Sequence, residues 1–306
     1  MTSISRRMRA AGVALVILAG AAVAIAARSQ EPVGGPPEGF ALTPSFSEEF
    51  YGAGLDTTRW RTAYRTDGVT PTTVANRSLY GNRERELYFD PAFLGLGVQP
   101  FSVADGVLTI TAAPMSPSVR EAVVAEVAKQ PLSIRNSPLK DVSYSSGLIT
   151  TKGSFSQLYG YFEIRARWTG GKGLWPAFWT LPSDGGWPPE FDIVEALGHE
   201  PTTVYQSVHS KQTGKAVGDT TRVPVPVPVN TSEFHTYGML WTKDEIRFYL
   251  DGKQTVTKPT PTDAHKPMYL LANLAVGGYW PGDPTATTPF PATMTIDYVR
   301  AWRLAQ

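Results

Sequence analysis

The chain has 306 residues, and its 28 Lys and Arg nearly balance its 27 Asp and Glu, which leaves a formal net charge of +1. The balanced charge argues against a nucleic-acid partner, and the complete lack of cysteine excludes disulfides, thiolate metal sites and a cysteine nucleophile. Short apolar runs are punctuated by 28 Gly and 26 Pro, which favours a β-sandwich over a doubly wound α/β fold.

The N-terminus predicts export. Three arginines precede an apolar stretch over residues 10–27, and Ala24-Ile25-Ala26 has the small-x-small form of a signal peptidase site. We therefore expect a signal peptide over residues 1–27, a flexible linker over 28–40, and one folded domain over 41–306. An uncleaved membrane anchor is the alternative, because the apolar stretch is close to the lower limit for spanning a bilayer.

Alternating apolar and polar residues predict the first strands. One covers residues 107–111, after the turn Asp105-Gly106, and another covers residues 161–167. The second should be half-buried, since three apolar residues alternate with four polar or aromatic ones: Phe162, Ile164 and Ala166 against Tyr161, Glu163, Arg165 and Arg167. Between the two strands, residues 118–129 carry good helix formers, with Ser118 as the expected N-cap of a short surface helix.

An aromatic run follows between Gly173 and Pro182. Strand periodicity places Trp175 and Trp179 on one face and Phe178 on the other. Sugars lie with their apolar ring face on an aromatic plate while their hydroxyls bond at the edges, so this pair predicts a carbohydrate cleft. The alternative for each Trp is packing in the core.

The most informative segment is Glu190-Phe191-Asp192-Ile193-Val194-Glu195, which places three carboxylates in an otherwise apolar strand. Strict alternation would put Glu195 on the face opposite Glu190 and Asp192, but one β-bulge between Asp192 and Glu195 would return it to their face. Two carboxyls about 5 to 5.5 Å apart are the equipment of a retaining glycosidase. The alternative is a solvated edge strand whose acids face water.

The later elements have clear signals as well. Residues 223–229 alternate Val and Pro and are expected to form an extended loop or an edge, because proline cannot donate to a ladder. Asp251-Gly252 predicts a hairpin.

The four histidines lack H-x-x-x-H and H-E-x-x-H spacing, so we expect no zinc site, with His235 as a structural residue. The glycine-rich run at residues 170–173 lacks the G-K-[ST] ending of a phosphate loop, so no nucleotide is expected.

From about Phe46 to Trp302 the chain resembles glycoside hydrolase family 16, in the branch with the bulged E-x-D-x-x-E motif found in laminarinases. The segments that carry the resemblance, in chain order, are FSEEF at residues 46–50, SGLIT at 146–150, YGYFE at 159–163, WPAFW at 175–179, EFDIVE at 190–195, VH at 208–209, FHTY at 234–237, NLAVGG at 273–278 and DYVR at 297–300. The resemblance implies an all-β fold, a concanavalin-like β-jelly-roll sandwich of two antiparallel sheets with a concave substrate cleft.

The resemblance also implies the site residues. It makes Glu190 the nucleophile, Asp192 the residue that orients and electrostatically tunes it, and Glu195 the acid/base. The expected substrate-binding residues are Trp175, Trp179, His209, Trp280, Asn82 and Asn273. No cofactor is required; a structural calcium ion near Glu48 and Asp297 is conceivable from the family.

The implied activity is a retaining endo-β-glycanase that hydrolyses a β-linked glucan or a bacterial exopolysaccharide, of β-1,3, β-1,3-1,4 or succinoglycan type. The implied partner is therefore a polysaccharide, with the protein acting as a monomer. Arg83 and Arg85 would favour an acidic polymer, or they pair with acids on their own strand. The alternatives are a transglycosylase using the same intermediate, a non-catalytic lectin-like domain, or a structural envelope protein held by its N-terminus.

Overall fold

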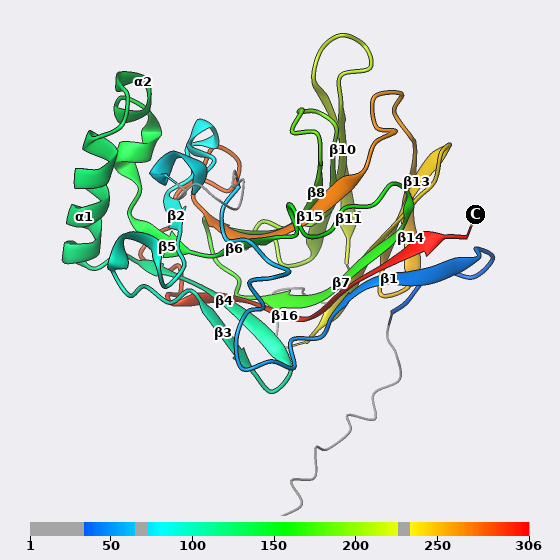
Figure 1. Cartoon of the computed structure of the whole chain (residues 1–306), viewed down its shortest axis with the longest axis horizontal. Coiled ribbons are helices and arrows are strands. Elements are labelled where there is room, and N and C mark those ends of the chain that lie inside the picture. The colour runs from blue at the N-terminus through cyan, green and yellow to red at the C-terminus, as the bar shows by residue number, and fades with distance from the viewer. Residues whose placement is uncertain (1–33, 65–72, 226–232, 306) are drawn as a thin grey trace, which may run out of the picture. The chain divides into compact units, whose positions relative to one another are not determined.

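The computed structural model describes residues 34–64, 73–225 and 233–305. Within these ranges the chain folds as two facing β-sheets (Figure 1). No helix in the described ranges is long and apolar enough to cross a membrane. The expected signal peptide or anchor, and residues 28–33 of the expected linker, lie outside the described residues.

The larger sheet has ten strands. Eight follow one another in the order β14-β13-β12-β7-β16-β4-β5-β2, while β1 pairs with β16 and β3 pairs with β4. In chain order these strands are β1 (Leu42–Glu48), β2 (Glu86–Tyr88), β3 (Phe101–Ala104), β4 (Val107–Pro114), β5 (Tyr144–Ser146), β7 (Gly160–Trp168), β12 (His235–Trp241), β13 (Glu245–Leu250), β14 (Lys253–Pro259) and β16 (Ala292–Leu304).

The smaller sheet has six strands in the order β11-β10-β9-β8-β15-β6. They are β6 (Leu148–Thr150), β8 (Leu174–Pro182), β9 (Glu190–Glu195), β10 (Thr203–Ser210), β11 (Val217–Pro224) and β15 (Met268–Val276). The sandwich expectation is confirmed, with one exception to antiparallel pairing: β2 and β5 run parallel.

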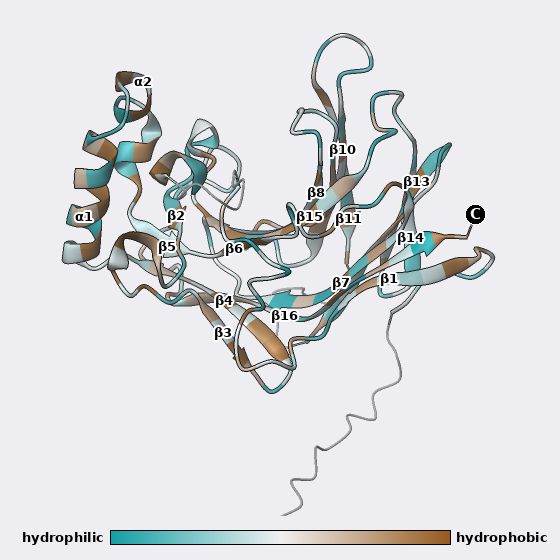
Figure 2. Cartoon of the chain, in the orientation of Figure 1, coloured by the Kyte–Doolittle hydropathy of each residue, from teal (hydrophilic) through white to brown (hydrophobic). Residues whose placement is uncertain are grey.

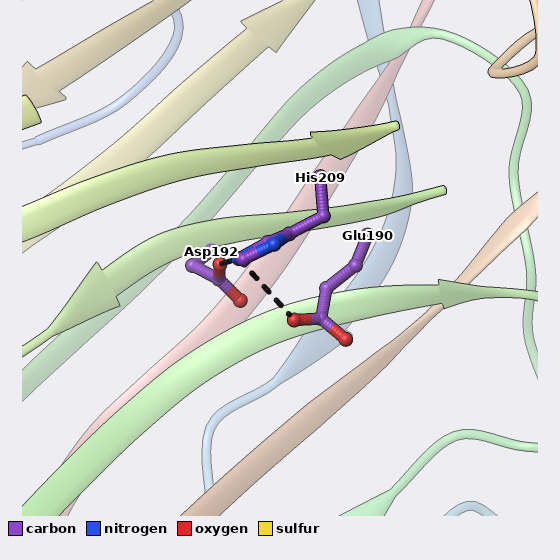
Figure 3. Close-up of side chains that lie close together, drawn as sticks. All are labelled: Glu190, Asp192 and His209. Carbon is purple, nitrogen blue, oxygen red and sulfur yellow. Dashed lines mark ion pairs between the residues drawn. The ribbon is translucent and has the colours of Figure 1, made fainter. Parts of the chain in front are cut away.

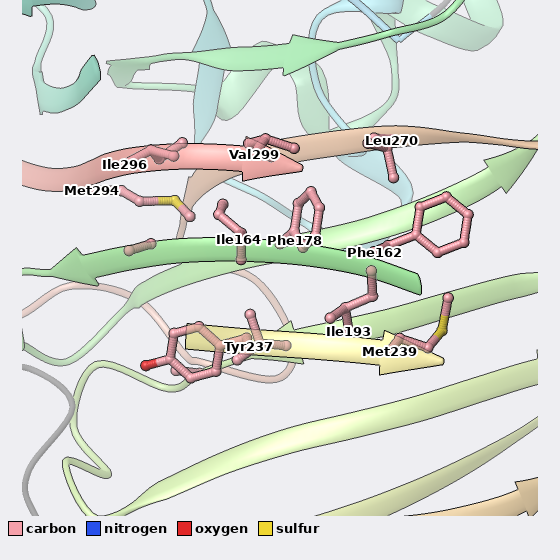
Figure 4. Close-up of a cluster of buried hydrophobic side chains, with 14 of the residues drawn as sticks. Phe162, Ile164, Phe178, Ile193, Tyr237, Met239, Leu270, Met294, Ile296 and Val299 are labelled. Atoms are coloured by element: carbon pink, nitrogen blue, oxygen red, sulfur yellow. The ribbon is translucent and has the colours of Figure 1, made fainter. Parts of the chain in front are cut away.

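The core lies between the sheets (Figure 4). The larger sheet contributes apolar side chains from β7, β12 and β16, and the smaller sheet contributes them from β8, β9 and β15. The labelled members are Phe162, Ile164, Phe178, Ile193, Tyr237, Met239, Leu270, Met294, Ile296 and Val299. Burying both inner faces leaves the outer face of the smaller sheet available for a binding site.

The two predicted Asp-Gly turns are confirmed. Asp105 and Gly106 have φ angles of 53° and 71°, and Asp251 and Gly252 have 48° and 71°. Both residues of a two-residue hairpin turn of this kind need positive φ, which Asp and Gly tolerate. The Val-Pro segment enters the structure as the end of β11, which is an edge strand as predicted; residues 226–229 lie outside the described ranges.

The predicted helix between strands is confirmed, but its N-cap lies two residues earlier than expected. Helix α1 (Pro117–Ala128) begins after Ser116, whose side chain accepts the N–H of Val119 at 3.3 Å, so the prediction of Ser118 as N-cap was wrong. The reason is Pro117, which lacks the N–H that the first helical position leaves unpaired.

Helix α1 joins α2 (Leu132–Arg135) and four short 3₁₀ turns at one end of the sandwich, beside β2 and β5 (Figure 1). These turns are η1 (Val74–Asn76), η2 (Tyr80–Asn82), η3 (Phe93–Gly95) and η4 (Pro138–Asp141). Hydrophobic and hydrophilic residues alternate along α1 (Figure 2). Val123 and Val127 of this helix pack with Leu87 and Leu139 in a second apolar cluster, so the insert is anchored by its own small core.

The expectation of a half-buried strand at residues 161–167 was wrong for its first half. Tyr161 and Glu163 are fully buried although they lie on the face opposite Phe162 and Ile164. The Glu163 carboxylate accepts the hydroxyl of Tyr161 at 2.8 Å and, from β16, that of Tyr298 at 2.8 Å. Alternation alone assigned this face to solvent because it cannot show that other segments of the chain cover it.

What covers Glu163 is the described end of the expected linker. The backbone N–H of Gly35 donates to both oxygens of the Glu163 carboxylate at 3.0 Å. A Cβ atom at Gly34 would lie 2.6 Å from the Tyr298 hydroxyl and 2.7 Å from Glu163, so only glycine fits this close approach.

Candidate active site

The site is built on β9. Asp192 pairs with Ser207 of β10, while Glu195 pairs with Tyr205, so three steps on β9 match two on β10. On the other side, the neighbours Phe178 and Trp179 of β8 pair with Val194 and Asp192. One residue is therefore inserted after Asp192, which confirms the predicted bulge.

Because of the bulge, some side chains of β9 lie in the core and the others line the cleft. Ile193 and Val194 are consecutive, yet both belong to the core cluster, as does Phe191. Glu190, Asp192 and Glu195 instead line one cleft on the outer face of the smaller sheet. We call these three residues the carboxylate row.

The cleft has a volume of about 370 Å³, and aromatic side chains form much of its wall. Trp175 and Trp179 face it from β8, as predicted, whereas Phe178 is buried in the core. Asn82 of η2, Trp187 in the loop before β9, and Tyr269 and Asn273 of β15 also line it. Further lining residues come from segments between the named elements: Tyr64, Glu84 and Lys152.

Each member of the carboxylate row has one nearby N–H group. Trp187 Nε1 donates to Glu190 Oε2 at 2.9 Å, and Trp175 Nε1 donates to Glu195 Oε1 at 3.0 Å. His209 Nε2 lies 3.0 Å from Asp192 Oδ2 and 3.7 Å from Glu190 Oε1, with its ring reaching across both acids (Figure 3).

Burial and mutual repulsion control the charge of the row. Burial, followed by the charge of Asp192, raises the pKa of Glu190 to about 8, against the lowering effects of His209 and the Trp187 N–H. Burial raises the pKa of Asp192 to about 8. Burial, followed by the charges of Asp192 and Glu190, raises the pKa of Glu195 well above its usual range. The row therefore retains protons at a pH at which exposed carboxyls have lost theirs.

The predicted substrate-binding residues divide into two groups. Trp175, Trp179, Asn82 and Asn273 line the cleft, whereas His209 and Trp280 are not among its lining residues. Trp280 is exposed and packs edge-on against Trp175, with ring centroids 5.2 Å apart at 89°.

Asn273 is a buried support for the wall of the cleft. Its Oδ1 accepts Trp179 Nε1 at 2.7 Å, and its Nδ2 donates to the Tyr88 hydroxyl at 3.0 Å. Both ends of the amide are thus engaged, which fixes the plane of the Trp179 ring. Asn82, by contrast, donates to Glu84 Oε1 at 3.1 Å on the rim.

Arg83 and Arg85 differ in their surroundings. Arg83 lies over the exposed ring of Tyr279 at 5.1 Å, and Arg85 Nε lies 3.8 Å from Asp283. Neither is among the residues that line the cleft. Arg85 therefore faces an acid, as in the ion-pair alternative, but that acid belongs to the loop after β15 and not to the same strand.

The residues expected near a calcium ion are engaged by protein groups. Glu48 accepts the N–H of Phe50 at 3.0 Å and Nε1 of Trp60 at 3.2 Å, while Asp297 pairs with Arg165 at 2.5 Å. Within the described ranges, Glu48 and Asp297 are in no cluster of three ligand-bearing side chains; the cluster that does form is Glu190, Asp192 and His209. In that cluster His209 Nε2 lies 3.0 Å from Asp192 Oδ2.

Sequence reasoning missed several parts of the cleft. Tyr64, Lys152 and Tyr269 come from segments far apart in the chain, and no pattern pointed to them. Trp187 had a signal, because it stands three residues before Glu190 in a Gly- and Pro-rich loop. That loop has no strand periodicity from which the direction of its side chain could be read.

A sandwich of this topology, with a carboxylate row facing an aromatic cleft, defines the class of carbohydrate-active jelly-roll proteins. The chain belongs to the glycosyl hydrolases family 16, whose family model matches residues 111–300.

Three similar proteins illustrate this membership. The endo-1,3-1,4-beta-glycanase ExsH of Rhizobium meliloti is 44% identical over 228 residues, which cover 74% of this chain and 45% of that protein. The chain thus spans less than half the length of that relative. Among solved structures, an endo-beta-1,3-glucanase from Pyrococcus furiosus is 31% identical with a TM-score of 0.68, covering 88% of this chain and 97% of that one. The laminarinase catalytic domain from Thermotoga maritima has 30% identity and a TM-score of 0.67, covering 87% and 99%.

Proposed function

We propose that the protein is a retaining endo-β-glycanase that hydrolyses a β-linked glucan or a bacterial exopolysaccharide. The observation that carries the proposal is the bulge in β9, which places Glu190, Asp192 and Glu195 together on the wall of an aromatic cleft. The named activities of the relatives, on β-1,3 and mixed β-1,3-1,4 linkages, indicate the substrate class.

In the first step, Glu190 in its ionised form attacks the anomeric carbon and forms a glycosyl ester. The bond to the leaving oxygen breaks, and that oxygen takes the proton of Glu195. The high pKa of Glu195 keeps this proton available, because the charges of Asp192 and Glu190 disfavour its loss.

In the second step, Glu195 is ionised and accepts a proton from water, whose oxygen bonds to the anomeric carbon as the ester to Glu190 breaks. Each carboxyl returns to its starting state, and two displacements at one carbon retain the configuration. Asp192 orients Glu190 through His209, which lies between their carboxylates.

The protein is proposed to act outside the cytoplasm as a monomer, after removal of residues 1–27. The leader pattern of the N-terminal sequence supports this location. A mass corresponding to cleavage after Ala26 or Ala27 in the exported protein tests it, and an intact N-terminus would contradict it.

Reducing-end release with product sizing on laminarin, mixed-linkage β-glucan and succinoglycan tests the activity, with Glu190→Gln as the matched inactive variant. Cleavage of one polymer by the parent alone supports the proposal and identifies the linkage. Longer products made by joining fragments would indicate a transglycosylase. Saturable binding without cleavage by either protein would contradict hydrolysis and favour the lectin-like alternative.

A further inference from the structure

The two glutamates of the carboxylate row are held in the same way. Each accepts one indole N–H on one oxygen: Glu190 from Trp187 at 2.9 Å and Glu195 from Trp175 at 3.0 Å. The two tryptophans come from different elements, since Trp175 is on β8 and Trp187 is in the loop that leads into β9.

The loop that carries Trp187 is held in place by its own contacts. Asp184 accepts the N–H of Gly186 at 3.1 Å and the ammonium of Lys266 at 2.8 Å. The Trp187 ring also lies 6.4 Å from the His209 ring, tilted by 37°. Trp187 is nevertheless 54% exposed, so it is not a residue of the core.

We propose that Trp187 is the positioning residue of Glu190 and Trp175 that of Glu195, each fixing through its N–H which carboxyl oxygen reacts. The inference rests on the proposed function for its chemistry, but the contacts themselves do not depend on it.

An indole nitrogen donates a hydrogen bond and cannot accept one. An oxygen that accepts the N–H therefore does not itself present a proton along that contact. At Glu195 this leaves Oε2 as the oxygen that carries the proton for the departing group. At Glu190 it holds Oε2 and leaves Oε1, on the His209 side, to form the bond to the anomeric carbon.

A tryptophan beside a cleft can also act only as a flat surface for a sugar ring. Trp→Phe substitution separates these roles, because phenylalanine keeps an aromatic face and lacks the N–H. If positioning is the role, Trp187→Phe lowers kcat about 10- to 100-fold with little change in KM, which corresponds to the loss of one hydrogen bond to a charged group. If the ring is only a platform, Trp187→Phe leaves kcat near the parental value.

The direct test is a ¹³C NMR titration of the glutamate carboxyls in the full chain, with Glu190→Gln and Glu195→Gln assigning the two signals. Loss of the N–H removes a contact that favours the ionised oxygen. Trp187→Phe should therefore raise the titration midpoint of Glu190 by about one pH unit, and Trp175→Phe should raise that of Glu195. Trp302→Phe, on the outer face of the other sheet beside Tyr161, is the matched control and should move neither midpoint.

The outcomes separate the two proposals. Unchanged midpoints in both variants would overturn the positioning roles, whatever the activity. The titration midpoints could instead shift in the two variants while the parent protein cleaves no polysaccharide. That result would support the positioning contacts and would overturn the proposed function.

Discussion

The molecule holds buried carboxyl groups on the outer faces of both sheets, and they differ in how completely they are paired. On the larger sheet, Glu163 accepts from two tyrosine hydroxyls and from the Gly35 N–H, so both oxygens are engaged. On the smaller sheet, Glu190 and Glu195 each accept from a single tryptophan and also repel one another.

This difference separates a structural carboxylate from a reactive one. A buried acid with several donors stabilises the fold because its desolvation is offset. Acids with one donor each, beside a cleft and beside other acids, retain lone pairs and protons for chemistry at the expense of stability. The comparison predicts opposite responses when the two kinds of acid are replaced.

The largest effect should be on catalysis. Glu190→Ala and Glu195→Ala should each lower kcat about 10⁴-fold or more, since residues that act together in one mechanism are each indispensable. Added azide should restore turnover in Glu190→Ala by occupying the space of the carboxylate, and should give a glycosyl azide of inverted configuration. Near-parental activity in Glu190→Ala would show that the nucleophile has been assigned wrongly.

Replacement of the structural carboxylate should instead affect folding. Glu163→Ala leaves the buried hydroxyls of Tyr161 and Tyr298 without an acceptor, and we expect a loss of about 3 kcal/mol in the free energy of unfolding. Urea denaturation measures it, with Glu121→Ala on the exposed side of α1 as the control. The kcat of the folded Glu163→Ala protein should equal that of the parent. If Glu163→Ala were as stable as the parent, Glu163 would not be a structural carboxylate.

Replacement of a reactive carboxylate should stabilise the protein at high pH. Folding raises the pKa of Glu190 from 4.5 to about 8, so its contribution to stability is complete below pH 4.5 and is lost as the pH rises through 8. Glu190→Gln has no charge to lose. Above pH 8 it should therefore be more stable than the parent by up to about 5 kcal/mol, because each pH unit of pKa shift corresponds to about 1.4 kcal/mol, and below pH 4.5 the two should match. Denaturation at several pH values checks this, and a pH-independent difference would contradict the burial argument.

The smallest effect should come from helix α1, none of whose residues lines the cleft or contacts Glu163. Ser116→Ala removes the cap of α1 and should cost about 1 kcal/mol of stability, with kcat unchanged. Ser118→Ala is the matched control and should cost less. A larger loss in the Ser118 variant would mean that the helix is capped as the sequence suggested.

The sequence predicted the reactive side of this comparison better than the structural side. The spacing of Glu190, Asp192 and Glu195 showed that one inserted residue would bring the three acids to one face, and the resemblance to the family with the bulged motif favoured that arrangement over a solvated edge strand; the bulge is present. The directions of Trp175 and Trp179 followed from the same period of two.

Glu163 was misjudged because its burial depends on Gly35, which lies 128 residues away in the chain. The N–H of Trp187 was missed because an irregular loop gives no rule for side-chain direction. Burial of a polar face and contacts made by loops depend on tertiary packing, which a local pattern does not contain.

The central claim is that the carboxylate row performs a two-step displacement. The most direct measurement is the anomeric configuration of the first product from a β-linked oligosaccharide, followed by ¹H NMR before mutarotation sets in. A two-step displacement gives the newly formed reducing end first as the β-anomer. Initial appearance of the α-anomer would show a single displacement by water and would contradict Glu190 as a nucleophile.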